Sequence, residues 1–467
     1  MFDKHHENRI RELVNKYEEA LQNNEEILFD EQDLGDITVY YLNELEYEKA
    51  MVLAEEGLIR FKYSSTFYNH KAEILKEISQ YEEALEVLDQ AEIFSPNETS
   101  TMLNKVDIFS ILERFEEAVE ILKKAIQTEH GSTKGELYLE LADIYEDWEK
   151  YFEVIWCLKQ CLDINPENEE ALGRMWFSVE LTETYEQSIK FHKELIELKP
   201  YNYLAWNNLG HAYRGIKDYK KAIEAFEFVM AINETYESAY IDCGDVLYKD
   251  EQYQKAINLY IEVLDFTSLK KEIYYNIGKC YDKLKDYQKS REYYKEAVII
   301  DPYYARAFYK IGKAFLNSDF SEKAIPQLEK ANKLEKNNLT FQVSLADAYI
   351  KTNKPEKALK IYDKLLNSNE KNKQVHLNLI TILYEMGNTT EALQHIESIL
   401  NTFEDISDLL YIKVAFLYEL EEREKSKKAL LEALLYNFDQ HEFLFDLMPI
   451  IETDQTFLDI IKSYSEK

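Results

Sequence analysis

Apolar residues recur at helical spacing along nearly the whole chain, and short polar stretches interrupt the pattern at regular intervals. The segment 203–236 shows this clearly, because its apolar positions form two groups, Trp206, Leu209 and Tyr213, then Ala222 and Phe226. Residues three or four apart lie on one face of an α-helix, whereas a strand would alternate every second residue. The segment is therefore predicted to form two amphipathic helices joined by a turn.

The two-helix pattern repeats every 34 residues. In the first helix, glycines recur at this interval, as Gly210, Gly244, Gly278 and Gly312. In the second helix small residues recur, as Ala222, Ala256, Ser290, Ala324, Ala358, Ala392 and Ser426. We predict twelve repeats, at residues 31–64, 65–98, 99–134, 135–168, 169–202, 203–236, 237–270, 271–304, 305–338, 339–372, 373–406 and 407–440.

Glycine inside a helix costs about 1 kcal/mol relative to alanine. The recurring glycine and alanine are therefore expected where the two backbones of a repeat cross closely. The stretch EHGSTKG at 129–135 holds two extra residues and predicts a loop insertion. Pro326 falls inside a second helix and is expected to bend or delay it, whereas Pro355 stands at a helix start, where proline is favoured.

A period of 34 residues with two helices and a turn resembles the tetratricopeptide repeat family. The match is best in 203–236, where the motif positions hold Trp206, Leu209, Gly210, Tyr213, Ala222 and Phe226. The resemblance implies an all-α fold, an α-α superhelix or solenoid of about twelve helical-hairpin repeats. Because one repeat cannot bury its apolar face alone, we also expect an N-terminal capping helix in 1–30 and capping helices in 441–467, around repeats in 31–440.

Charge narrows the range of partners. The 467-residue chain has a formal charge of −34, and residues 1–200 hold 20 basic against 46 acidic residues, whereas 251–350 hold 16 against 14. An acidic chain repels phosphate, so we expect neither nucleic acid nor an anionic membrane surface as a partner. The sequence contains no run of about 18 apolar residues, so insertion into a membrane is not predicted.

Three further observations concern location and chemistry. The N-terminus lacks an apolar signal segment and only four cysteines occur, which favours a cytoplasmic protein; the abundance of Lys, Tyr, Asn and Ile favours a bacterial source. No phosphate-binding loop, HExxH pair or calcium loop is present, so we predict a non-enzymatic protein without metal or cofactor. Cys157 and Cys161 lie one helical turn apart and are interpreted as packing residues, with half a metal site as the alternative.

The family resemblance implies that first helices line a concave groove with their second, fifth, sixth, ninth and twelfth positions. In the early repeats these positions are largely acidic. In repeats six to nine they supply a candidate binding set, Asn207, Asn208, His211, Arg214, Tyr248, Tyr275, Asn276, Lys279, Arg306, Tyr309, Lys310 and Lys313. Arginine and lysine capture carboxylates, so the expected ligand is an extended protein or peptide segment with acidic groups or a C-terminal carboxylate.

Some members of the family hold C-terminal carboxylates with five residues spread over three repeats. Asn276, Arg306 and Lys310 stand at three of these positions. Ile241 and Asp245 stand where the family has lysine and asparagine, and Asp245 would repel a carboxylate.

Other interpretations remain open. The acidic N-terminal third is a second candidate, for a basic partner, and the basic cluster is equally compatible with a solvated face. A different class of function is a structural one, in which the solenoid forms a homo-oligomer. The last alternative is a regulatory subunit of a multiprotein complex.

Overall fold

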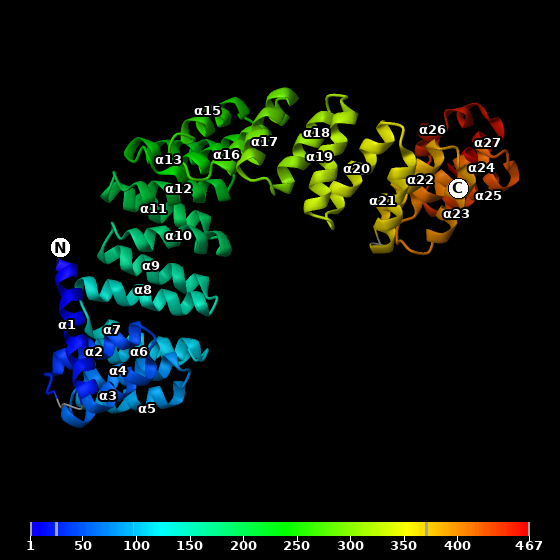
Figure 1. Cartoon of the computed structure of the whole chain (residues 1–467). Coiled ribbons are helices and arrows are strands. Elements are labelled where there is room, and N and C mark those ends of the chain that lie inside the picture. The colour runs from blue at the N-terminus through cyan, green and yellow to red at the C-terminus, as the bar shows by residue number, and fades with distance from the viewer. Residues whose placement is uncertain (1, 24–26, 97, 369–371, 466–467) are drawn as a thin grey trace. The chain divides into compact units, whose positions relative to one another are not determined.

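The computed structural model describes residues 2–23, 27–96, 98–368 and 372–465, and these residues form helices and short connections without a strand (Figure 1). The first half of the chain contains α1 (Phe2–Asn23), α2 (Glu31–Asn43), α3 (Tyr47–Arg60), α4 (Ser65–Glu77), α5 (Tyr81–Phe94), α6 (Thr99–Ile111), α7 (Phe115–Thr128), α8 (Gly131–Asp147), α9 (Tyr151–Ile164), α10 (Glu169–Thr182), α11 (Tyr185–Leu198), α12 (Tyr203–Gly215), α13 (Tyr219–Ile232) and α14 (Glu237–Lys249).

The second half continues in the same manner. It contains α15 (Tyr253–Val263), α16 (Lys270–Lys283), α17 (Tyr287–Ile300), α18 (Ala305–Leu316), α19 (Ser321–Leu334), α20 (Leu339–Lys351), α21 (Pro355–Ser368), α22 (Lys373–Glu385), α23 (Thr389–Ile399), α24 (Ser407–Glu419), α25 (Arg423–Tyr436), α26 (Glu442–Leu447) and α27 (Gln455–Ser465), with 3₁₀ helices at Phe438–Gln440 and Pro449–Thr453.

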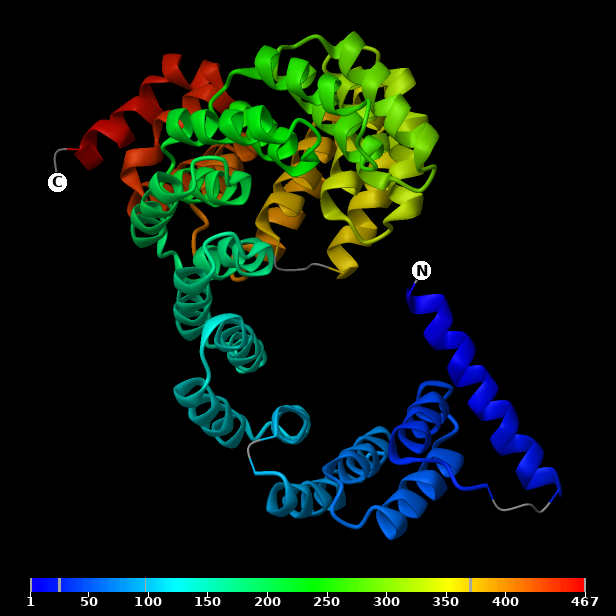
Figure 2. The same cartoon turned by 90° about the vertical axis from the view of Figure 1, so that its left-hand side faces the viewer.

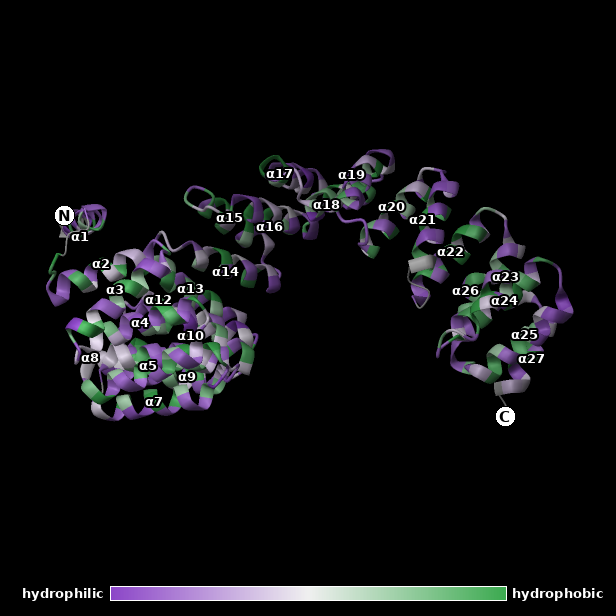
Figure 3. Cartoon of the chain, turned by 60° about the horizontal axis from the view of Figure 1, so that its bottom comes forward, coloured by the Kyte–Doolittle hydropathy of each residue, from purple (hydrophilic) through white to green (hydrophobic). Residues whose placement is uncertain are grey.

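Within each unit successive helices pair into hairpins, for example α2 with α3 and α24 with α25, and the predicted all-α solenoid is confirmed. The predicted division into caps and repeats at residues 30 and 440 stays a prediction. The chain forms two compact units, Met1–Val246 (unit 1) and Leu247–Lys467 (unit 2). In Figure 2 the helices of unit 1 follow one another in chain order from blue to green. Hydrophobic and hydrophilic residues share each helix, as amphipathic hairpins require (Figure 3).

The recurring glycine makes room for a side chain of the partner helix. A Cβ added at Gly210 would lie 2.7 Å from a ring atom of Phe226, and one at Gly278 would lie 2.6 Å from Tyr294. At Gly312 it would lie 2.6 Å from Leu328 and 3.5 Å from the backbone oxygen of Ala324. These three side chains stand four residues after the recurring small residue. The nearest neighbour of each of these glycines is thus a ring or leucine seated on it, and at Gly312 the backbone of the recurring small residue is also in contact.

Every hairpin turn holds one residue with a positive φ. These residues are Leu45, Ser79, Glu113, Glu149, Glu183, Lys217, Glu251, Lys285, Asp319, Asn353, Gly387 and Glu421. Their spacing is 34 residues throughout, except for 36 between Glu113 and Glu149. Only Gly387 is a glycine, although this backbone conformation favours glycine strongly. The turn geometry is therefore set by the packed hairpin and not by the residue at the turn.

Two local predictions need correction. The stretch 129–135 is not a loop insertion, because α8 begins at Gly131 and is lengthened to 17 residues. Pro326 lies inside α19 and does not delay it, because the helix begins at Ser321, at the same place in the repeat as the other second helices, while the expected bend stays a prediction. Pro355 begins α21, as expected.

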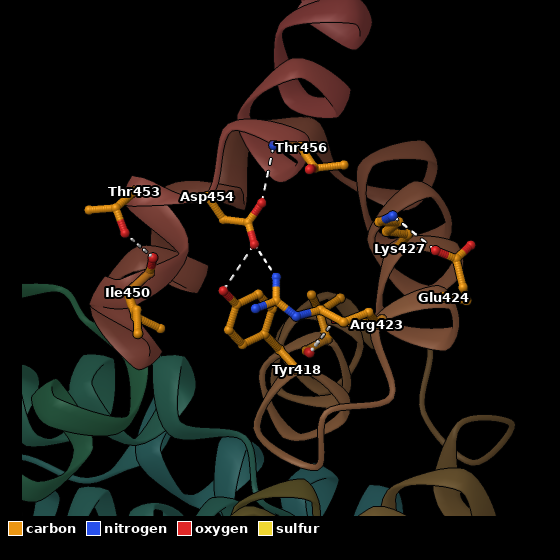
Figure 4. A network of polar contacts seen from close by, with 10 residues as sticks. Tyr418, Arg423, Glu424, Lys427, Ile450, Thr453, Asp454 and Thr456 are labelled. Carbon is orange, nitrogen blue, oxygen red and sulfur yellow. Dashed lines mark hydrogen bonds and ion pairs between the residues drawn. The ribbon is translucent and has the colours of Figure 1, made fainter.

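Helices cover both ends. Leu13 and Val14 of α1 are buried against the first hairpins, whereas Leu21 is 56% exposed. At the other end Asp454 holds α27 to the last hairpin (Figure 4). Its carboxylate accepts hydrogen bonds from the Tyr418 hydroxyl at 3.0 Å, from Arg423 and from the Thr456 backbone N–H at 3.1 Å.

Candidate protein-binding face

Three of the predicted binding residues on α12 are buried. Asn207, Asn208 and His211 are 4%, 3% and 9% exposed. The Asn208 amide donates a hydrogen bond of 2.8 Å to the Leu172 carbonyl oxygen, and so joins α12 to α10. The His211 ring stacks on Trp176 with a centroid distance of 5.0 Å. These three side chains are inaccessible to a partner in this structure, and Asn208 and His211 contact the preceding repeat.

Arg214 is engaged by two carboxylates of neighbouring helices. Its guanidinium donates to Asp242 Oδ1 at 3.0 Å and to Glu180 Oε2 at 3.1 Å. Asp242 also lies 3.4 Å from His211 Nε2, but burial, with a smaller contribution from the Arg214 charge, lowers the pKa of His211 to about 3. Burial raises the pKa of Asp242 to about 6 despite the opposing effect of Arg214. The imidazole is therefore neutral, and Arg214 balances the carboxylates.

A second arginine of unit 1, which the sequence patterns did not single out, is bound in the same way. Arg174 on α10 lies 2.6 Å from Asp143, 3.1 Å from Glu146 and 3.2 Å from Glu170, and its side chain is 19% exposed. Two of these acids, Asp143 and Glu146, belong to the acidic positions of α8. The acidic face of unit 1 is thus partly neutralised by its own arginines.

In unit 2, the predicted residues of α14 and α16 form a layer of tyrosines with one lysine. The Lys279 ammonium lies 4.8 Å from the ring centroid of Tyr248 and donates to Asn276 Oδ1 at 3.3 Å. Tyr275 lies 5.3 Å from Tyr294 and 5.2 Å from Tyr304, ring centre to ring centre. Burial raises the pKa of Tyr275 to about 12, so its hydroxyl stays a hydrogen-bond donor at neutral pH. The rings of Tyr248 and Tyr275 are half-buried and held by their neighbours.

The predicted residues of α18 lie on one face of the helix, because Tyr309, Lys310 and Lys313 follow Arg306 by three, four and seven residues. Arg306 is exposed, and Tyr309 stacks on Phe341 with centroids 4.7 Å apart. The Arg306 charge acts on the hydroxyl of Tyr275, which places the α16 and α18 residues beside each other. Lys279, Arg306, Lys310 and Lys313 are named the cationic face below.

None of these four cations lies within 4.0 Å of a carboxylate among the residues that the structure describes. The nearest acids have other partners or are shielded. Lys310 acts on Asp282, but that carboxylate accepts hydrogen bonds from the hydroxyls of Ser290 and Tyr294. Burial raises the pKa of Asp282 and of Asp347, the acid on which Lys313 acts. The cationic face therefore has charge available for a ligand.

Comparison with known families agrees with the helical-hairpin fold. Three models described as tetratricopeptide repeat match the chain, over residues 203–236 and 272–304, 321–381, and 99–129 and 135–168. This chain is a tetratricopeptide repeat protein. Tetratricopeptide repeats mediate protein–protein interactions, and all of these matches are to repeats.

Solved tetratricopeptide repeat structures resemble parts of the chain at low identity. YrrB, a protein with an unusual peptide-binding site, is 17% identical, with 40% of this chain and 96% of YrrB covered and a TM-score of 0.34. The APC/C hetero-tetramer Cut9–Hcn1 is 15% identical, with 81% and 89% covered and a TM-score of 0.36. A repeat protein from Parabacteroides merdae is 16% identical, with 56% and 98% covered and a TM-score of 0.38. No curated protein matches the sequence.

Other chemistry is sparse in the described part of this repeat protein. No group of three or more His, Cys, Asp or Glu residues there is arranged to hold a metal ion. No described helix combines the length and apolar character needed to cross a bilayer. The four cysteines are buried, and burial raises the pKa of Cys157 and of Cys243 to about 12, so both of these thiols are protonated and pack as small apolar groups.

Proposed function

We propose that this tetratricopeptide repeat protein is a non-enzymatic scaffold that binds an extended, carboxylate-bearing segment of a partner protein along the cationic face of α16 and α18. The observation that carries the proposal is the absence of ion pairs at Lys279, Arg306, Lys310 and Lys313 in the described structure. A cation that already has an internal ion pair must break that pair to bind a carboxylate, whereas these four have no such pair to break. The proposal leaves out Asn207, Asn208 and His211, which are buried.

The position of the cations supports an extended ligand. Asn276 and Lys279 on α16 occupy the same places in their repeat as Lys310 and Lys313 on α18, so polar groups recur at one repeat spacing along neighbouring first helices. A segment that crosses the two helices meets one such group on each. The exposed Arg306 supplies a planar fork suited to two-point contact with a carboxylate.

The tyrosines support specificity. Tyr275 and Tyr309 are held in place by ring contacts with Tyr304 and Phe341, so a ligand that packs on them does not need to order them first. Preordered aromatic side chains give contact area at small entropic cost. The partner segment is therefore expected to carry apolar or aromatic residues between its acidic ones.

The test uses a labelled peptide that alternates glutamate with apolar residues and ends in a free carboxylate. The double variant R306E/K310E reverses two cations of the face and is expected to lower affinity at least about tenfold, which corresponds to about 1.4 kcal/mol. The same peptide with glutamine in place of glutamate is expected to bind weakly to the unaltered protein.

The matched control is K255E/K295E. Lys255 on α15 and Lys295 on α17 are exposed lysines on second helices of the same unit, so the net charge changes equally while the cationic face is untouched. Binding within about twofold of the unaltered protein is expected. Equal losses of affinity in the two variants would mean that binding depends on the net charge of the protein and not on the cationic face. Undiminished binding by R306E/K310E would overturn the proposal.

A further inference from the structure

A cleft of about 790 Å³ opens in unit 1 between the second helices of two consecutive repeats. Its walls are α5 and α7, its floor is α6, and α8 contributes Thr133 and Leu137. The cleft lies far along the chain from the cationic face and is lined entirely by residues of unit 1. It is thus a second candidate surface with its own chemistry.

The corresponding place in the sixth repeat is nearly filled. Helices α6 and α12 begin at Thr99 and Tyr203, and their turns follow at the same interval, so Met102 takes the place of Trp206 and Lys124 that of Phe228. In the sixth repeat the two rings stack with centroids 4.3 Å apart. The space left there is about 330 Å³. The cleft therefore opens because the third repeat lacks this pair of rings.

The preceding repeat gives the same result with another pair of rings. There Tyr68 takes the place of Met102, and its ring lies 5.5 Å from that of Phe94. The residue of the third repeat that takes the place of Phe94 is Thr128, which lines the cleft. Two repeats of the array thus place aromatic pairs where the third repeat has Met102, Lys124 and Thr128.

The floor of the cleft carries a buried cation. Lys105 takes the place of Leu209 of the sixth repeat, is 8% exposed, and lies 2.7 Å from Asp89 and 2.5 Å from Glu92 on one wall. Burial opposes its charge, but the hydrogen bonds to both carboxylates raise the pKa of Lys105 above its ordinary value. A buried charge is costly unless it is paired, and here the pairing uses two of the wall carboxylates.

The other residues that line the cleft are apolar between the walls and mostly acidic at the outer edges of the walls. Seven carboxylates line the cleft against three cations, Lys105, Arg114 and Lys124. Glu86 on α5 and Glu120 on α7 stand on opposite walls, and both are exposed. Glu120 lies 2.7 Å from Lys124 of its own helix, an exposed pair that a ligand cation would replace at small cost. Between the walls the cleft presents Leu85, Met102, Phe109, Ile121, Ala125 and Leu137. An apolar strip between acidic edges complements a helix with one apolar face and basic flanks.

We propose that this cleft binds a basic amphipathic helix of a partner protein. Its apolar face packs on Met102, Phe109 and Ile121, and its lysines or arginines meet Glu86 and Glu120. The lining of α7 runs from Glu117 to Thr128, which at 1.5 Å per residue is about 16 Å, or three turns of a bound helix. The inference does not rest on the proposed function, because it concerns the other unit and a ligand of opposite charge.

The probe is a labelled synthetic peptide with leucines at helical spacing and lysines on both flanks, measured by fluorescence anisotropy. Two reference peptides replace its lysines by glutamates or shuffle its leucine spacing. The unaltered full-length protein is expected to bind the lysine peptide at least about tenfold more tightly than either reference. Equal binding of the lysine and glutamate peptides would overturn the proposal, and equal binding of the shuffled peptide would exclude a helical ligand.

Two double variants locate the site. M102Y/T128F copies the aromatic pair of the second repeat, fills the cleft and keeps every charge. E86K/E120K keeps the space and reverses two wall charges. Each is expected to weaken binding of the lysine peptide at least about tenfold. The control E82K/E116K makes the same charge change one turn earlier on the same helices, at exposed residues outside the cleft, and is expected to bind within about twofold of the unaltered protein.

Circular dichroism and thermal unfolding show which variants fold. If M102Y/T128F does not fold, the site is tested by comparing the peptide affinity of E86K/E120K with that of the control E82K/E116K. Equal losses in those two variants, or undiminished binding by a folded M102Y/T128F, would overturn the assignment. A dimer in light scattering that M102Y/T128F converts to monomer would replace the partner helix by a second copy of this chain. R306E/K310E is expected to leave binding of the lysine peptide unchanged, which separates this result from the proposed function.

Discussion

Arg174 and Lys310 occupy the same place in the fifth and ninth repeats, yet their surroundings differ. Arg174, in unit 1, lies within 3.2 Å of each of three carboxylates. Lys310, in unit 2, is half-buried and has no carboxylate within 4.0 Å among the described residues. A repeated position thus gives the same location on a first helix but not the same role. In unit 1 the cation stabilises the array, and in unit 2 it is available to a ligand.

The largest expected effect is a difference in the free energy of unfolding between substitutions of Arg174 and of Lys310. Arg174→Met leaves Asp143, Glu146 and Glu170 without their cation, and we expect it to lower the free energy of unfolding by about 2–3 kcal/mol. Lys310→Met removes no ion pair and should change it by less than about 0.5 kcal/mol. Thermal unfolding of the two variants measures the difference. Similar losses in both would show that Lys310 is as structural as Arg174.

The second prediction concerns a buried histidine of unit 1. His192 is fully buried, its Nδ1 lies 2.9 Å from the Ser188 carbonyl oxygen, and burial lowers its pKa to about 4. The folded state therefore prefers the neutral ring, and its contribution to stability is present above the unfolded pKa of about 6.5 and is lost as the pH falls toward 4.

At pH 5 this loss is about 2 kcal/mol, so His192→Leu should flatten the fall of the unfolding temperature between pH 7 and pH 5. The matched control is His130→Leu, at an exposed histidine before α8, which should leave the pH dependence unchanged. If His192→Leu follows the unaltered protein over this range, the ring is not held neutral by burial.

The smallest expected effect is one that the two units should share. Lys217 in unit 1 and Lys285 in unit 2 have φ values of 63° and 60° at their hairpin turns. Lys217→Gly and Lys285→Gly should each raise stability by about 0.5–1 kcal/mol, because glycine adopts this conformation without strain. Substitution by alanine, which removes the charge but keeps the Cβ, should give no gain. A gain in only one unit would mean that the hairpins of the two units are not equivalent.

Much of the fold follows from the spacing of side chains alone. Gly210, Gly278 and Gly312 place the first helices, and the small residues twelve positions later place the second ones. The sequence did not indicate which side chain packs on each glycine, because Phe226, Tyr294 and Leu328 are apolar residues that could pack in many arrangements. The turn residues carried no signal, since lysine and glutamate rarely mark a positive φ.

The candidate site was predictable only in part. Helical spacing identified the face of α18, but it does not report which cations have ion-pair partners, since Arg174 is neutralised by acids from α8 as well as from its own helix. The burial of His211 had a signal in Trp176, a large residue where other repeats have glycine. Its ring lies on His211 of the next repeat and helps to cover it. The cleft of the third repeat depends on the absence of aromatic pairs, which becomes visible only when equivalent places are superposed.

The lengthened α8 also adds to the surface of the cleft beside α7. Thr133, in the added turn, lines the cleft together with Leu137 of the same helix. A helix docked as proposed therefore contacts four helices of the array, and the two extra residues of the third repeat become part of its binding surface.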